Sequence, residues 1–174
     1  NGKKHGSILC LLGPPGVGKT SIAQALAGAL NKKIASIPMG TLTSAFDLRG
    51  IASEYSTGHI GKVAQALIDS GSKQGVILLD EIDKIPHISI ANTLLDVLDP
   101  QQNKAFVDDY VGTPIDLSQV FFVATANDIQ EIPDPLYDRM TIVPVEGYST
   151  RQKIEIAEQH LLPKILQESN IATA

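Results

Sequence analysis

Short apolar runs and segments of helical periodicity alternate along most of this chain. The apolar runs predict five strands, at residues 8–12, 34–37, 76–80, 120–126 and 141–145. The periodic segments predict four helices, at residues 20–30, 60–70, 89–98 and 150–162. This alternation is typical of an α/β domain, in which a mainly parallel sheet is covered by helices on both faces. The third and fourth runs are almost wholly apolar, which predicts that they are central strands.

Two of the predicted helices carry further signals. In the first helix, Ile22, Leu26 and Leu30 fall on one apolar stripe. At the start of the last helix, Ser149 and Gln152 have the spacing of a capping box, in which each side chain bonds the backbone of the other residue. Because this helix follows the last predicted strand, we expect it to begin a separate helical unit.

The composition of the chain narrows the range of functions. Its 174 residues are enough for one substantial core. The net charge of −5 argues against a broad nucleic-acid or membrane surface, and no apolar stretch reaches the ~20 residues that a membrane-spanning helix needs. The single cysteine, Cys10, excludes an internal disulfide, and its apolar neighbours predict an inert core position. The four histidines show no metal-ligand spacing.

A glycine-rich segment follows the first predicted strand. Residues 13–20 read Gly-Pro-Pro-Gly-Val-Gly-Lys-Thr, the pattern of a P-loop, and a predicted helix comes directly after them. Glycines let the backbone turn tightly enough for its N–H groups to converge on phosphate oxygens, and the helix N-terminus adds its positive dipole end. We therefore expect a nucleoside triphosphate to bind at Gly13, Pro14, Pro15, Gly16, Val17, Gly18, Lys19, Thr20 and Ser21.

Two side chains of this segment have expected roles in phosphate and metal binding. Lys19 would hold the β- and γ-phosphates, and the hydroxyl of Thr20 would complete the shell of a Mg²⁺ ion. The alternative is a glycine-rich turn with a surface lysine. The strand and helix that flank the segment favour the P-loop.

Two adjacent carboxylates, Asp80 and Glu81, end the third apolar run. Ligands of open α/β sheets bind at the carboxyl ends of strands, so these acids are expected to meet Mg²⁺ and the γ-phosphate. One carboxylate is enough to hold the metal through its water shell, and we assign that role to Asp80. Glu81 is then free to act as the general base on the attacking water. The alternative is that Asp80 and Glu81 are a solvated strand end. For the neighbouring Asp83 and Lys84 we expect a surface charge pair, with a role as interface groups as the alternative.

Two more polar residues lie near the last two predicted strands. Asn127 ends the fourth run and is expected to bond the γ-phosphate or the attacking water, or alternatively to open a turn with Asp128. A GTPase would carry Asn-Lys-x-Asp here, whereas Asn127 is followed by Asp-Ile-Gln, which favours ATP. Arg139 precedes the last strand, and its planar fork of donors suits charge on a γ-phosphate; the alternative is a structural contact with Asp138.

With these residues placed, the chain resembles the ATPase core of the Lon family of ATP-dependent proteases, in the AAA+ superfamily. The resemblance runs from about Ser7 to Pro163, and four stretches carry it in particular: residues 13–21, 79–84, 94–103 and 126–148. It implies a nucleotide-binding α/β domain at 1–148 and the beginning of an α-helical lid at 149–174. By position, it assigns Lys19 and Thr20 to Walker A, Asp80 and Glu81 to Walker B, Asn127 to sensor 1, and Arg139 to the arginine finger.

The resemblance also implies a function. In this family ATP hydrolysis drives the unfolding and translocation of protein substrates, and the arginine finger acts on the ATP of a neighbouring subunit. We therefore expect a homo-oligomer, a hexameric ring, that acts on unfolded or damaged proteins in the cytoplasm or the mitochondrial matrix, with no membrane or nucleic-acid partner. The Ser–Lys dyad of the family lies in a later domain, and the resemblance implies that this segment holds only the beginning of the lid. As a separate segment, the chain is expected to be no protease and a weak ATPase.

The resemblance is weakest in the loop that grips substrate in the pore of the family's ring. Arg49, Gly50 and Gly61 fit the frame of that loop, and Tyr55 matches its aromatic residue. The basic pair is missing, Ser56 replaces the aliphatic residue, and the later segment 85–89, where a second pore loop would lie, is short. Tyr55 is thus a candidate gripping residue or a plain surface tyrosine.

Other functional classes also fit parts of the pattern. A non-proteolytic AAA+ remodelling or regulatory ATPase is consistent with the altered region around Tyr55. An assembly module that binds ATP to hold a ring would need the same P-loop but little turnover. A small-molecule kinase is disfavoured, because the chain has no counterpart of an arginine-rich phosphoacceptor lid.

Overall fold

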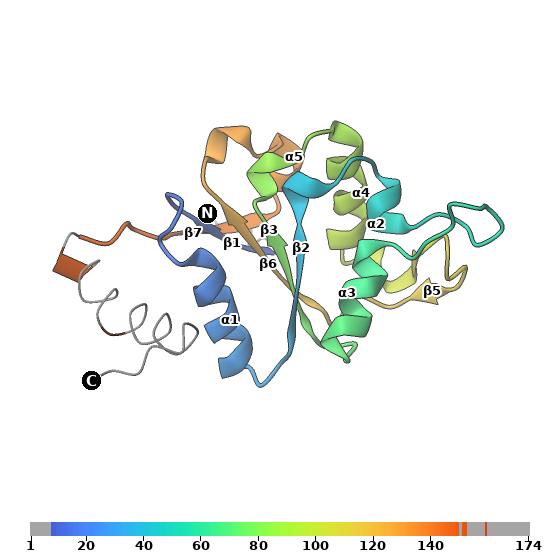
Figure 1. Ribbon diagram of the computed structural model, residues 1–174, viewed down its shortest axis with the longest axis horizontal. Helices are drawn as coiled ribbons and strands as arrows, with labels where there is room; N and C mark the ends of the chain where they lie inside the picture. The colour runs from blue at the N-terminus through green and yellow to red at the C-terminus, as the bar shows by residue number, and fades with distance from the viewer. Residues whose placement is uncertain (1–7, 150, 153–158, 160–174) are drawn as a thin grey trace, which may run out of the picture.

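The computed structural model describes residues 8–149, 151–152 and 159 (Figure 1). Its strands are β1 (Ile8–Leu12), β2 (Ile34–Pro38), β3 (Val76–Asp80), β4 (Phe106–Val107), β5 (Pro114–Ile115), β6 (Phe121–Ala126) and β7 (Met140–Pro144). Its α-helices are α1 (Lys19–Ala29), α2 (Phe46–Arg49), α3 (Lys62–Ser70), α4 (Ile88–Leu98) and α5 (Asp134–Tyr137). Short 3₁₀ turns lie at η1 (Met39–Thr41), η2 (Ile82–Lys84), η3 (Asn103–Ala105) and η4 (Ile129–Glu131).

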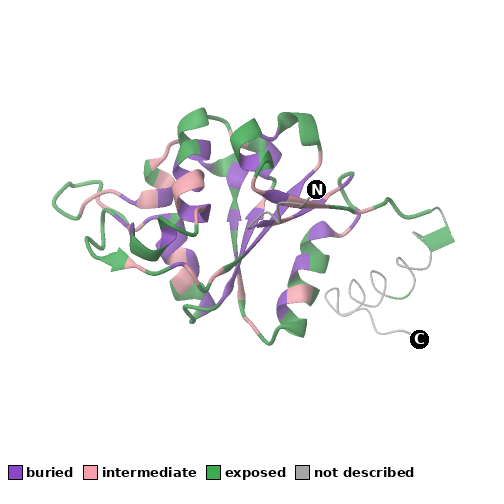
Figure 2. Ribbon diagram, turned by 180° about the vertical axis from the view of Figure 1, so that it is seen from behind, coloured by how far each residue is buried: buried purple, intermediate pink, exposed green. Residues whose placement is uncertain are grey.

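The main sheet has five strands in the order β2-β3-β6-β1-β7, and every neighbouring pair is parallel. All five predicted strands are present, within one residue of their predicted bounds. The two most apolar runs, β3 and β6, lie inside the sheet and are buried along nearly their whole length, as Figure 2 shows. The predicted α/β class with a parallel five-stranded sheet is therefore confirmed.

Helices cover both faces of the sheet unequally (Figure 1). On one face α1 is the helix that packs on the sheet among the described residues, and there Ala23 and Ala27 meet Leu11, Leu78 and Val123 from three strands. The other face carries α2, α3, α4 and α5 over a larger apolar cluster. Because all strands run the same way, their carboxyl ends meet at one edge of the sheet, where the loop before α1 also lies.

The apolar stripe predicted for the first helix is wrong. Ile22 and Leu30 are 40% and 44% exposed, whereas Ala23 and Ala27 are buried. The small alanines bring α1 close to the sheet, and the larger side chains lie at the margin of that contact. Leu26 is half-buried beside the alanines.

The second and third predicted helices are confirmed as α3 and α4. Gly71 ends α3 in the left-handed region, at φ 60°, where a residue without a Cβ is favoured. The apolar residues Leu94 and Leu98 of α4 are buried, and the helix ends before Asp99. The predicted start of α3 at residue 60 is two residues early, because the helix begins at Lys62 after Gly61.

The reciprocal bonds of the predicted capping box are present. The backbone N–H of Ser149 donates to Gln152 Oε1 at 2.9 Å, and the backbone N–H of Gln152 donates to Ser149 Oγ at 3.4 Å. Most of the predicted helix at 150–162 lies outside the described residues. The division into a domain at 1–148 and a lid at 149–174 stays a prediction.

Several short elements, η2 and η4 among them, have no counterpart in the predicted pattern. The stretch from η1 through α2, which follows β2, is another. So is the antiparallel hairpin of β4 and β5, in which Phe106 pairs with Ile115. Each consists of pieces of two to four residues, too short for a periodic pattern to develop.

Cys10 is fully buried in β1, as predicted. Burial, and after it the nearby carboxylate of Asp83, raises the pKa of the Cys10 thiol to about 11. The thiolate is the reactive form, so this side chain is chemically inert at neutral pH. None of the helices within the described residues is long and apolar enough to cross a membrane.

Candidate functional site

The loop between β1 and α1 has the backbone that a P-loop requires. Gly16 and Gly18 have φ angles of 79° and 85°, in the left-handed region that disfavours residues with a Cβ. Gly13 is needed for a different reason, because a Cβ there would lie 2.2 Å from the carbonyl oxygen of Val145. Gly18 is also the N-cap of α1, so the helix N-terminus opens directly out of the loop.

The ammonium group of Lys19 links this loop to the end of β6. Its Nζ donates to the carbonyl oxygens of Gly13 at 2.7 Å and Pro14 at 2.9 Å, and to Oδ1 of Asn127 at 2.8 Å. Lys19 is only 9% exposed. The alternative of a surface lysine on a plain turn is therefore wrong. The cation instead lies inside the loop, where a phosphate would bind.

Thr20 and Asp80 lie next to each other across this site. Thr20 Oγ1 donates to Asp80 Oδ1 at 3.5 Å. A hydroxyl and a carboxylate at this spacing fit the hard, oxygen-rich shell that Mg²⁺ prefers, in which water and phosphate oxygens supply the remaining ligands. No group of three or more His, Cys, Asp or Glu side chains with metal-site geometry occurs in the described part of the chain. A metal here would therefore depend on the phosphates as well as on the protein.

Thr125, for which the sequence pattern predicts no role, contacts both acidic residues. Its hydroxyl donates to Asp80 Oδ1 at 2.5 Å and accepts the backbone N–H of Glu81 at 2.9 Å. Thr125 is 1% exposed. A polar residue two positions before Asn127, inside an otherwise apolar strand, is the sequence signal that points to it.

The Asn127 side chain lines the cavity, whereas the side chain of the neighbouring Asp128 opens the following turn. The Asn127 side chain points to Lys19, through the hydrogen bond between its Oδ1 and Nζ. The Asp128 side chain opens the following turn, because it accepts the backbone N–H of Gln130 at 2.9 Å. Asn127 therefore lies at the cavity, and its expected contact with the γ-phosphate or the attacking water stays a prediction.

These groups border one cavity of about 320 Å³ at the carboxyl edge of the sheet. Its lining consists of Pro15, Gly16, Gly18, Lys19, Thr20, Asp80, Glu81, Thr125 and Asn127. Four predicted phosphate-binding residues are not part of this lining: Gly13, Pro14, Val17 and Ser21. Of these, Gly13 and Pro14 hold Lys19 through their carbonyl oxygens, Val17 is buried, and Ser21 is exposed on α1.

The expected surface charge pair of Asp83 and Lys84 is wrong for Asp83, which is buried. Asp83 Oδ2 lies 3.3 Å from Lys84 Nζ and accepts the backbone N–H of Asp128 at 3.4 Å. Lys84 also pairs with Glu131 in η4. These contacts connect the turn after Glu81 to the segment after Asn127. The reason for the burial is that η2 turns back into the core, where Ile82 is fully buried as well.

Arg139 does not line the cavity. Its Nη1 lies 3.4 Å from Asp99 Oδ2 and 3.5 Å from the carbonyl oxygen of Leu95, at the end of α4. The backbone N–H of Gln101, and with it Arg139, lowers the pKa of Asp99 below its ordinary value. Within the described residues, the ion pair of Arg139 is thus with Asp99 rather than with Asp138, the partner that the structural alternative named.

Tyr55 lies in the loop between α2 and α3, which extends from the body of the domain in Figure 1. Its side chain is 62% exposed. The loop is closed at its base by two backbone hydrogen bonds between Ile51 and His59, of 2.9 and 3.1 Å. The buried carboxylate of Asp108 accepts the backbone N–H of Gly61 at 2.8 Å and so ties this base to the loop between β4 and β5.

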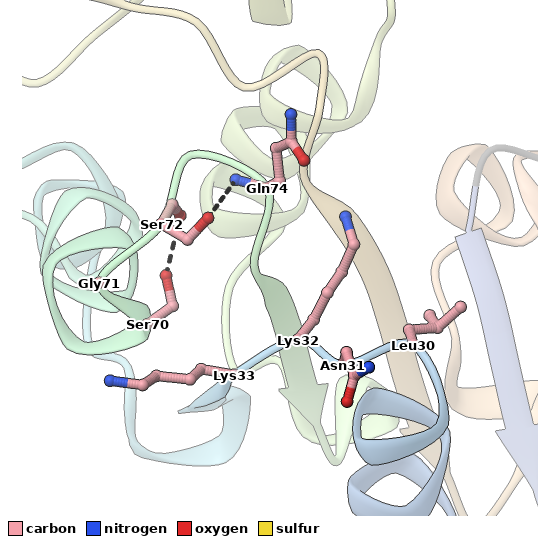
Figure 3. Close-up of a pocket in the computed structure, with 8 residues that line it drawn as sticks. All are labelled: Leu30, Asn31, Lys32, Lys33, Ser70, Gly71, Ser72 and Gln74. Carbon is pink, nitrogen blue, oxygen red and sulfur yellow. Dashed lines mark hydrogen bonds between the residues drawn. The ribbon is translucent and has the colours of Figure 1, made fainter.

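A second cavity of about 320 Å³ lies at the opposite edge of the sheet, before β2 and β3 begin (Figure 3). The hydroxyl of Ser70 is bonded to the carbonyl oxygen of Ser72, and the hydroxyl of Ser72 to the backbone N–H of Gln74. The side chains of Lys32 and Lys33 point in different directions. The groups around this cavity therefore do not converge on a ligand.

A sequence comparison decides the family. The description of the ATPase family associated with various cellular activities (AAA) matches residues 9–146, which include the P-loop, the acidic pair, Asn127 and Arg139. This chain belongs to the AAA family of ATPases. Nucleotide binding is the property that this membership supports.

The AAA domain is also similar to part of several Lon proteases. It is 44% identical over 172 residues to the Lon protease of Desulforamulus reducens, covering 97% of this chain and 21% of that protein. It is 44% identical over 174 residues to the mitochondrial Lon protease homolog of Saccharomyces cerevisiae, covering 98% of this chain and 15% of that protein. It is 46% identical over 172 residues to the peroxisomal Lon protease homolog 2 of Zea mays, covering 97% of this chain and 19% of that protein.

The AAA domain thus spans only about a fifth of the length of these relatives. The resemblance to the Lon family is confirmed along nearly the whole chain. The relatives are named for different compartments at nearly the same identity, so similarity does not locate this protein. The cytoplasm and the mitochondrial matrix stay predictions.

Proposed function

We propose that this AAA domain is the ATP-binding and ATP-hydrolysing module of a Lon-like ATP-dependent protease and drives the unfolding and translocation of protein substrates. The observation that carries the proposal is the convergence of Lys19, Asp80, Glu81 and Asn127 on one cavity beside the P-loop. One cation, two carboxylates and a polar amide at a triphosphate site are the groups that hydrolysis needs, beyond binding alone. The similarity to Lon proteases supplies the link from hydrolysis to proteolysis.

Each group of the cavity has a separate task in this proposal. Lys19 holds the β- and γ-phosphates. To do so, its ammonium group gives up the hydrogen bonds to the loop carbonyls and donates to phosphate oxygens instead. Thr20 and Asp80 hold Mg²⁺, which neutralises charge on the phosphates when it is bound. Glu81 accepts a proton from the attacking water, and Asn127 orients that water or the γ-phosphate.

The position of Arg139 supports action on a neighbouring subunit. Arg139 directly precedes β7, whose first residue pairs with Ile8 at the start of β1, whereas the P-loop follows the other end of β1. The five residues of β1 span about 16 Å, farther than an arginine side chain extends. Arg139 therefore serves the site of an adjacent protomer in a homo-oligomeric ring, which we propose to be hexameric. Within a single protomer, Asp99 holds the guanidinium of Arg139 at the end of α4.

Tyr55 is the proposed contact with the substrate polypeptide. An exposed aromatic ring on a loop with a closed base presents apolar area at a small entropic cost, which suits contact with an unfolded chain of any sequence. Because the basic pair and the following aliphatic residue are missing from this loop, contact with the substrate depends on the ring of Tyr55. We therefore expect its removal to uncouple hydrolysis from substrate handling.

This expectation gives the experiment that tests the proposed function. In the full-length protein, wild type and Tyr55→Ala are compared for ATP-dependent cleavage of an unfolded, fluorescently labelled protein and for phosphate release, with Tyr55→Phe as the matched control. Wild type and Tyr55→Phe should cleave the substrate into peptide fragments when ATP is present. Tyr55→Ala should lower the rate of cleavage about tenfold or more, as expected when an aromatic anchor is lost. Its rate of phosphate release should stay within about threefold of wild type.

The other outcomes of this experiment select the alternatives. Phosphate release without fragments identifies a non-proteolytic AAA remodelling or regulatory ATPase, which the altered region around Tyr55 favours. Unchanged cleavage in Tyr55→Ala assigns Tyr55 to the plain surface. Nucleotide binding without phosphate release identifies an assembly module.

A further inference from the structure

The hydroxyl of Thr125 is the direct link between the two acidic residues of the site. It lies on β6 beside the end of β3, 2.5 Å from Asp80 Oδ1 and 2.9 Å from the backbone nitrogen of Glu81. The backbone N–H of Glu81 can only donate, so the oxygen of Thr125 must accept there. The hydroxyl proton is then directed to the carboxylate of Asp80. One buried hydroxyl thus has a fixed orientation between two partners.

On Asp80, this bond selects one carboxylate oxygen. Both hydroxyl donors, from Thr125 at 2.5 Å and Thr20 at 3.5 Å, reach Oδ1. Within the described residues Oδ2 accepts no hydrogen bond from the protein. Thr125 therefore fixes the rotation of the carboxylate and leaves the second oxygen for the water shell of a metal ion.

On Glu81, the same hydroxyl holds an uncommon backbone conformation. Glu81 has φ 57° and ψ 54°, in the left-handed region that residues with a Cβ rarely adopt. Its N–H is bonded to Thr125, and its carbonyl oxygen accepts the N–H of Lys84 at 2.9 Å. This conformation is where the chain turns from β3 into η2, and it determines how the Glu81 side chain enters the cavity lining.

We propose that Thr125 is a positioning residue for hydrolysis: its hydroxyl sets the metal-holding carboxylate of Asp80 and the general base Glu81 relative to each other. This inference rests on the proposed function and adds a residue to its machinery. Packing alone does not require threonine, because valine has nearly the same shape and the neighbours Ala124 and Ala126 are apolar and buried. What valine lacks is the hydroxyl.

The test compares Thr125→Val, Thr125→Ser and Thr93→Val in the full-length protein. Thr93 is a matched control, because it is also buried but its hydroxyl bonds the carbonyl oxygen of Ser89 in α4, outside the cavity. The readouts are kcat and KM for ATP, the Mg²⁺ concentration that gives half-maximal rate, and the melting temperature.

Thr125→Val should lower kcat about ten- to a hundredfold, the effect of losing one hydrogen bond to a charged group, and leave KM for ATP within about threefold. It should also raise the Mg²⁺ concentration required. Thr125→Ser should restore both values to within about threefold of wild type, and Thr93→Val should match wild type. A loss of packing in Thr125→Val would not by itself raise the Mg²⁺ concentration required, and Thr125→Ser, which restores the hydroxyl but lacks the methyl group, would not reverse it.

Three results would overturn the inference. One is a Thr125→Val protein with wild-type kcat and Mg²⁺ requirement. The second is failure of Thr125→Ser to restore a rate that Thr125→Val has lost. The third is an equal loss in Thr93→Val. A wild-type protein that releases no phosphate contradicts the proposed function itself, and the inference then falls with it.

Discussion

Arg139→Ala should lower the turnover of ATP by about 10³- to 10⁵-fold in the oligomeric full-length protein and leave ATP affinity nearly unchanged. Arginine fingers have effects of this size in other nucleoside triphosphatases, equivalent to about 4–7 kcal/mol of transition-state stabilisation. Affinity is spared because the finger stabilises charge that develops in the transition state, whereas Lys19 and Thr20, which hold the phosphates and the metal, belong to the cavity of the protomer that binds the ATP. Phosphate release and binding of a fluorescent ATP analogue, measured on the same preparation, separate the two effects.

A lysine variant controls for charge. Arg139→Lys keeps the cation beside Asp99 but loses the planar fork of donors, so it should remain strongly impaired. The ion pair with Asp99 is partly exposed, so its loss has little effect on folding. Equal losses of binding and turnover in Arg139→Ala would contradict the assignment.

Glu81→Gln should lower kcat by about 10²- to 10⁴-fold and trap bound ATP without hydrolysis. Glutamine keeps the size of the side chain and its place in the cavity lining but cannot accept the proton of the attacking water. The backbone bond from Glu81 to Thr125 does not involve the changed atoms, so the local fold is preserved. Filter binding of labelled ATP, followed by analysis of the retained nucleotide, measures the trapping. Unchanged steady-state hydrolysis would rule out Glu81 as the base.

Mixing the two variants tests whether Arg139 acts between subunits. In mixed rings, an Arg139→Ala protomer keeps its own Glu81 and can receive the intact Arg139 of a Glu81→Gln neighbour. Activity should therefore reappear on mixing two proteins that are each inactive. If Arg139 served its own site, every protomer would still lack one group, and the mixture would stay inactive.

The sequence was sufficient to predict the sheet and the location of the site. The apolar runs of β3 and β6 are buried on both faces and leave no alternative to central strands. The loop before Lys19 could be predicted because its backbone turns at φ angles that favour glycine, and the glycines are visible in the sequence. Because the strands are parallel, the carboxyl ends of β1, β3 and β6 meet at one edge, so Lys19, Asp80 and Asn127 were expected to lie together there.

What the sequence did not predict depends on contacts between distant segments. Ala23 and Ala27 are buried in place of Ile22 and Leu30 because of how closely α1 approaches the sheet, which helical spacing does not specify. The burial of Asp83 follows from the turn of η2 into the core. The role of Thr125 follows from the parallel pairing of β6 with β3, which brings residues 45 positions apart into contact.

Calorimetry measures whether Lys19, Asp80 at the end of β3 and the following Glu81 form a Mg·ATP site. A slowly hydrolysed analogue, ATPγS with Mg²⁺, is titrated into folded, oligomeric full-length protein and into its Lys19→Ala variant. We expect saturable binding at no more than one nucleotide per chain in the wild type and its loss in Lys19→Ala. Absence of binding in the wild type, or equal binding in both proteins, would contradict it.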